Sequence, residues 1–182
     1  MRRVVMMILG TLVLASSASA QTPDETIERA LVAAPRQAKD GATVIKWKAD
    51  YTYETIKKGT NSWVCFDRSG EPGEQPFAAQ CTSMANLPRV AQNRKFEAIQ
   101  DAKERQAALD AAEANGTRVK PEYGSAFISA NGKDMASSRT HVTIAVPGAT
   151  TQTTGLPDNP KQGGAWLMNA GTTTAHIMVP GH

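Results

Sequence analysis

Apolar and polar residues alternate along residues 45–54, and this pattern constrains the fold more than any other feature of the chain. One parity carries Ile45, Trp47, Ala49, Tyr51 and Tyr53, and the other carries only polar or charged residues. Such alternation predicts β structure with one buried face and one face in water. We expect two strands with a bend near residues 49–50, and a third strand over 62–66 after turn residues at 58–61.

The last third of the chain carries further β signals. Residues 123–128 lead to Asn131-Gly132, a dipeptide typical of tight turns, and residues 139–146 alternate again. Residues 147–164 are rich in Pro and Gly, which predicts an irregular loop. After a short apolar patch at 166–168, residues 175–179 predict a final strand.

Two segments have helical patterns. Thr22-Pro23-Asp24-Glu25 is a capping box with Pro at the first helical position, and it predicts a helix over 23–34 that ends before Pro35. Residues 89–115 are rich in Ala, Glu, Lys, Arg and Gln and end at Asn115-Gly116, which predicts a long helix. Its sparse apolar stripe favours a solvated helix lying across a sheet, with a partner-binding helix as the alternative.

These elements predict an α+β fold, with an antiparallel sheet of about four to six strands, two helices and one disulfide. The two cysteines, Cys65 and Cys81, are 16 residues apart, and an even number in an exported protein indicates a disulfide bond. We expect the bond to stabilise an irregular loop over 67–83. The alternative is a redox-active or metal-binding pair, but the spacing is not Cys-x-x-Cys.

The first twenty residues resemble a cleavable secretory signal. Arg2 and Arg3 precede an apolar run over 4–14, and Ala18-Ser19-Ala20 provides a small-residue cleavage site. The alternative is a buried N-terminal helix. We therefore expect residues 1–20 to be a signal peptide and residues 21–182 to form a single exported α+β domain, periplasmic or secreted, with no membrane span after cleavage.

Charge excludes one class of partner. Without Arg2 and Arg3 the chain has 18 basic and 17 acidic residues, and these are interspersed rather than clustered. Nucleic-acid binding usually requires a basic patch or stripe, so we expect no nucleic-acid partner.

Two segments carry a resemblance. Gly59-Thr60-Asn61-Ser62-Trp63-Val64-Cys65 is similar to a Gly-Thr-Asn-x-Trp-x-Cys segment, and the tail has Trp166-Leu167-Met168 followed by Ala175-His176-Ile177-Met178-Val179-Pro180. In this order they resemble small exported bacterial proteins of unknown function. The resemblance covers about a quarter of the exported chain. It implies an exported single domain and no particular activity.

The His176-Ile177-Met178 sequence suggests a metal site. Positions i and i+2 of a strand point the same way, so His176 and Met178 could meet one ion. Imidazole with thioether sulfur suits copper. His141 is expected on the same face if the two strands are neighbours, and Met168 or His182 could add a third ligand.

Aromatic residues form another candidate group. Trp47, Tyr51, Tyr53 and Trp63 favour a buried core, because aromatic side chains bury the most area, with a ligand-stacking platform as the alternative. Trp63 and Trp166 are the best candidates for a platform, since each lies beside a turn or loop.

No catalytic motif is present: the chain has neither His-Glu-x-x-His nor Gly-x-Ser-x-Gly. The leading hypothesis is therefore a non-catalytic exported module that binds a small ligand or acts as an accessory to an envelope protein, with no cofactor. The alternative is a periplasmic copper-binding protein using the His-x-Met site. A small hydrolase is third, and would require His141 and His176 to converge in a pocket.

Overall fold

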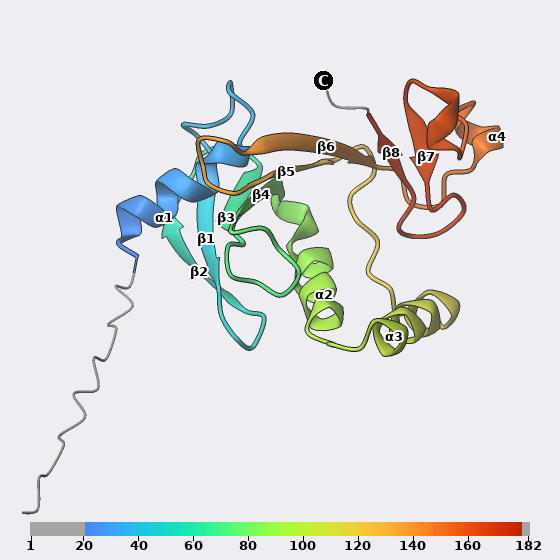
Figure 1. The fold of residues 1–182 in the computed structure, drawn as a ribbon, viewed down its shortest axis with the longest axis horizontal. Helices are drawn as coiled ribbons and strands as arrows, with labels where there is room; N and C mark the ends of the chain where they lie inside the picture. Colours follow the sequence, from blue (N-terminus) through green and yellow to red (C-terminus); the bar gives the residue numbers. More distant parts are fainter. Residues whose placement is uncertain (1–20, 180–182) are drawn as a thin grey trace, which may run out of the picture.

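The computed structural model describes residues 21–179, and within them one mixed eight-stranded sheet with helices on both faces (Figure 1). The predicted signal peptide and residues 180–182 lie outside the described residues. The strands are β1 Thr43–Trp47, β2 Tyr53–Lys57, β3 Trp63–Asp67, β4 Phe77–Ser83, β5 Ala126–Gly132, β6 Arg139–Ala145, β7 Trp166–Met168 and β8 His176–Met178. The helices are α1 Pro23–Ala30, α2 Leu87–Glu97, α3 Ala102–Ala114 and the single-turn α4 Thr151–Thr154.

The strand order is β2-β1-β3-β4-β5-β6-β8-β7, and every neighbouring pair is antiparallel except β1 and β3. The α+β class and the disulfide are thus confirmed, but the expected count of four to six strands and two helices is wrong. So is a purely antiparallel sheet, because β3 returns beside β1 in the same direction as β1.

Strand β4 accounts for one missed element, since residues 67–83 were expected to be a loop. Phe77, Ala78, Ala79, Cys81 and Thr82 are all buried, on both faces of this central strand. A strand covered on both faces has no alternation to reveal it. The loop is therefore confined to residues 68–76.

The predicted helix over 89–115 is two helices. The first, α2, ends at Glu97, and Asp101 then begins α3 by accepting hydrogen bonds from the backbone N–H of Lys103 and Glu104, each 2.9 Å long. An Asp N-cap satisfies backbone donors that a new helix leaves free. The chain therefore bends between α2 and α3.

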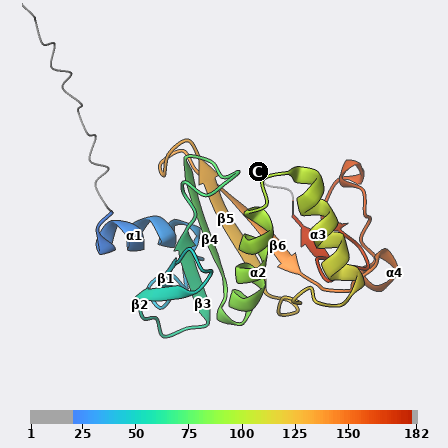
Figure 2. The same cartoon turned by 90° about the horizontal axis from the view of Figure 1, so that it is seen from below.

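Two clusters of buried residues hold the helices on the sheet. On one face, α1 and the 3₁₀ turn Leu31–Ala33 pack on the sheet beside the disulfide. On the other, Leu87 and Val90 of α2 pack on Ile45, Val64 and Phe66. Figure 2 shows α2 and α3 together in front of the sheet, with α1 to one side.

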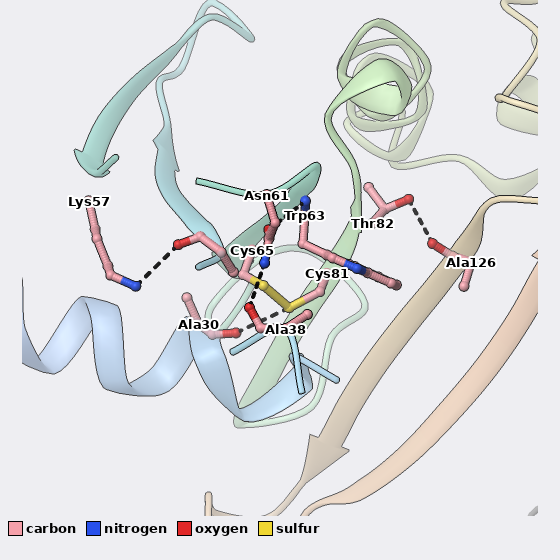
Figure 3. The surroundings of a disulfide bond; sticks show 10 residues. Ala30, Ala38, Lys57, Asn61, Trp63, Cys65, Cys81, Thr82 and Ala126 are labelled. Atoms are coloured by element: carbon pink, nitrogen blue, oxygen red, sulfur yellow. Dashed lines mark hydrogen bonds between the residues drawn. A yellow bond between two sulfur atoms is a disulfide. The ribbon is translucent and has the colours of Figure 1, made fainter. Parts of the chain in front are cut away.

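The disulfide lies inside the α1-side cluster (Figure 3). Cys65 and Cys81 are direct register partners on β3 and β4, their Cα atoms are 4.1 Å apart, and both are fully buried. The bond therefore joins two paired strands rather than a loop to the core.

The Gly-Thr-Asn-x-Trp-x-Cys segment has an architectural role. A Cβ on Gly59 would lie 2.3 Å from the carbonyl oxygen of Gly41, so only glycine fits. Asn61 donates from Nδ2 to Ala38 O at 2.8 Å and accepts from the Trp63 backbone N–H at 2.9 Å (Figure 3). These contacts fix the entry to β3 and hence the position of Cys65.

Candidate functional site

The hairpin of β7 and β8, at the end of the sheet, gathers on one face three side chains of the predicted metal site and one tryptophan of the predicted ligand platform. The register pairs Trp166 with Met178 and Met168 with His176. Directly opposed residues of an antiparallel pair point to the same side, with Cβ atoms about 4.5–5.5 Å apart. Trp166, Met168, His176 and Met178 thus form a two-by-two array, here called the His–Met array.

The opposite face of the same hairpin anchors it. Leu167 is 1% exposed and packs with Val146, Ala149 and Ala175, and Ile177 packs against the same cluster. Because Leu167 and Ile177 alternate with the array residues, their burial directs the array to the other face. On β6, Thr143 pairs with Met178 and Ala145 pairs with His176. Thr143 and Ala145 line the same cavity as Arg89 of α2, so the array is on the face of the sheet that α2 covers.

The array is accessible from solvent. Met168 is 39% exposed, and Trp166, His176 and Met178 are half-buried. On the β6 side its neighbours are Thr143 and Ala145, whose side chains are small. An ion can therefore approach the two thioether sulfurs and the imidazole.

The backbone fixes the tautomer of His176. Its Nδ1 lies 2.8 Å from the carbonyl oxygen of Thr174. A carbonyl oxygen only accepts hydrogen bonds, so Nδ1 carries the proton, and in the neutral ring Nε2 presents a lone pair. Metal-binding histidines commonly donate their second ring N–H in this way, which orients the ring.

His141 does not join His176. His141 is on β6, where it pairs with Ser129 of β5. His176 of β8 pairs with Ala145, which lies four residues after His141 on β6. That offset is about 13 Å along a strand. His141 is exposed and is instead the diagonal neighbour of Met178 on the same face. His182, the other suggested ligand, lies outside the described residues.

The two tryptophans predicted as a ligand platform lie far apart in the sheet. Trp63 is half-buried on β3 and packs against the α1-side cluster, whereas Trp166 belongs to the edge strand on the α2 side. Trp47 packs edge-on against Tyr53 and Phe66, with ring centroids 5.6 and 5.8 Å apart. Tyr51 sits in the β1–β2 turn, beneath the Lys95 ammonium at 5.8 Å.

Within residues 21–179, no three His, Cys, Asp or Glu side chains form a group that could hold a metal ion. Across the same residues, no helix is long and apolar enough to cross a membrane.

The sequence patterns did not reveal Arg89, which is only 3% exposed although it was assigned to a solvated helix. It is held by hydrogen bonds to Val119 O and to the hydroxyls of Thr173 and Thr174. These partners lie 30 to 85 residues away, so no local signal could have identified it.

Searches against protein-family models, curated proteins and solved structures find no match to this chain.

Proposed function

We propose that this protein is an exported binding module that takes up Cu(I) on the His–Met array. The observation that carries the proposal is the register of β7 and β8, which sets Met168 opposite His176, with Met178 two residues further along the strand. Same-face neighbours on a strand are about 6.8 Å apart, and methionine has three flexible torsions. Two thioether sulfurs and one imidazole nitrogen can therefore converge on one ion without backbone movement.

The ligand chemistry favours a soft ion. Thioether sulfur selects Cu(I), whereas hard divalent ions prefer carboxylate and carbonyl oxygen. The His176 ring already has its Nδ1–H engaged by Thr174 O, so its Nε2 is left free to bind the ion. Trp166, across from Met178, adds an aromatic ring whose π-face attracts cations.

Export is part of the proposal. The N-terminal residues have the composition of a signal peptide, and the buried Cys65–Cys81 disulfide is of a kind that persists in oxidising compartments. The hydrolase alternative required His141 and His176 to share a pocket, and the β6–β8 register separates them. A binding role remains the better supported of the two.

An anaerobic competition titration against a coloured Cu(I) chelator tests the proposal. We expect one tightly held Cu(I) per chain, and at least tenfold weaker binding in each of M168L, M178L and H176A. Leucine preserves the volume and apolar character of methionine, so these changes remove the sulfur with little effect on packing. M84L is the matched control, because Met84 is equally exposed, at 40%, but lies just before α2.

Absence of Cu(I) uptake would overturn the proposal. Binding that M168L and M178L leave unchanged, or that M84L weakens as much, would also overturn it. Loss of binding in H176A alone would reduce the site to a single histidine and contradict the role of the thioethers.

A further inference from the structure

Arg89 is a buried cation whose described partners are all neutral. Its Nη1 donates to Val119 O and, at 3.4 Å, to Thr173 Oγ1, and its Nη2 donates to Thr174 Oγ1 at 3.1 Å. Among residues 21–179 no carboxylate oxygen lies within 4.0 Å of it. Glu113 reaches it only indirectly, by accepting a 2.6 Å hydrogen bond from the Thr173 hydroxyl.

Three other arginines have a carboxylate partner, whereas the buried Arg118 is held by the neutral side chains of Gln92 and Asn93. The guanidinium groups of Arg29, Arg68 and Arg94 each contact a carboxylate directly. Burying a charge without a counterion is costly, so a buried charge is ordinarily paired. A guanidinium has five N–H donors, and the three hydrogen bonds of Arg89 leave Nε–H and one Nη2–H with no acceptor in the described residues.

Arg89 borders a cavity of about 190 Å³ between α2 and strands β4, β5, β6 and β8. The polar part of its wall consists of Arg89, Gln80, Asn93, Thr143, Thr174 and His176. The apolar part is formed by Phe127, Pro121, Ala145 and Ala175. Sites for drug-sized ligands occupy roughly 300–1,000 Å³, so this cavity has room for only a small molecule.

The wall can donate several hydrogen bonds beside the cation. Asn93 uses its Oδ1 to accept from Arg118 Nη2 at 2.6 Å, which leaves its Nδ2 hydrogens available. The Thr143 hydroxyl makes no hydrogen bond to another described residue. Burial, with a smaller contribution from Arg118, outweighs the opposing effect of the Glu113 carboxylate and lowers the pKa of Arg89 to about 10, so the guanidinium is still charged at neutral pH.

We infer that this cavity binds a small organic monocarboxylate, with the carboxylate on Arg89 and a short apolar chain against Phe127 and Pro121. Arg89, which no described carboxylate contacts directly, can pair with one negative charge. The apolar part of the wall favours an organic acid over a fully hydrated inorganic anion. This inference does not rest on the proposed Cu(I) function, although His176 belongs to the His–Met array and also lines the cavity.

Calorimetric titration with butyrate and with benzoate tests this inference. Butyramide serves as the neutral analogue of butyrate, and inorganic phosphate as the competing anion. We expect at least one of the two acids to bind, and butyramide and phosphate to bind at least tenfold more weakly. R89Q should weaken acid binding at least tenfold, whereas R105Q, which removes an arginine outside the cavity, should not change it.

T143V keeps the inference testable if R89Q fails to fold, because it removes a cavity hydroxyl without altering side-chain volume appreciably. We expect it to weaken acid binding several-fold with unchanged thermal stability. The inference is wrong if neither acid binds, or if phosphate binds more tightly than both acids. It is also wrong if R89Q or T143V binds the acid as tightly as the wild type does. None of these results bears on Cu(I) binding, which is measured without added acid.

Discussion

The Cys65–Cys81 bond is predicted to be a major source of stability, and its contribution can be divided into two parts. The bond closes a 16-residue separation between strands that are already paired by hydrogen bonds. In the chain-entropy model, such a loop closure stabilises the native state by about 3 kcal/mol. Both sulfurs are fully buried, and removing each one should cost about 1 kcal/mol more in lost burial.

Reduced wild-type protein keeps the sulfurs and loses only the crosslink, so we expect its free energy of unfolding to fall by about 3 kcal/mol. The double variant C65A/C81A loses both contributions, so we expect a fall of about 5 kcal/mol. Urea denaturation followed by circular dichroism measures both values. The urea m-value should rise in both cases, because the unfolded chain becomes more expanded.

The reasoning would be refuted if reduction lowered the free energy of unfolding by less than about 1 kcal/mol. It would also be refuted if the reduced protein and C65A/C81A were equally stable, because the buried sulfurs would then contribute nothing to packing.

Two further substitutions test the supports of the sheet. Burial raises the pKa of Asp67, but hydrogen bonds from Ser69 and from Arg29, the latter 2.5 Å long, outweigh it and lower the pKa below 3.8. The carboxylate therefore stabilises the fold at neutral pH, and D67N should lower the free energy of unfolding by about 1–3 kcal/mol at pH 7. In urea denaturation at a series of pH values, this difference from wild type should shrink as the pH falls below about 4. In thermal unfolding, G59A should lower the stability of the fold by at least about 3 kcal/mol, because the new Cβ would meet a backbone oxygen. The control G70A, with open space around it, should lower the stability by about 1 kcal/mol. Similar losses of stability in the two variants would contradict the steric argument.

Local chemistry explains which elements were predictable. The α1 capping box is present as expected: Thr22 accepts from the Glu25 backbone N–H at 3.3 Å, and the Glu25 carboxylate accepts from the Thr22 N–H at 2.8 Å. Both partners lie within one helical turn, so four residues of sequence specify them. By contrast, the parallel pairing of β1 and β3 depends on where the chain crosses the sheet, which no periodicity encodes.

The candidate site divides along the same line. That His176 and Met178 share a face follows from strand alternation alone. That Met168 lies opposite His176 depends on the register of β7 and β8, which the sequence does not fix because each strand is only three residues long. The burial of Arg89 could not be predicted from local sequence at all, because the residues that hold it, 119 and 173–174, come from distant parts of the chain.

The most direct test of the His–Met array is an NMR titration of protein labelled with ¹³C at the methionine methyl groups, using Ag(I) as a stable substitute for Cu(I). At one equivalent, the methyl signals of Met168 and Met178 should shift, together with the ring signals of His176. The signals of Met84 and Met135, which lie on other parts of the surface, should stay in place. Shifts at all four methionines alike, or at neither Met168 nor Met178, would contradict the account.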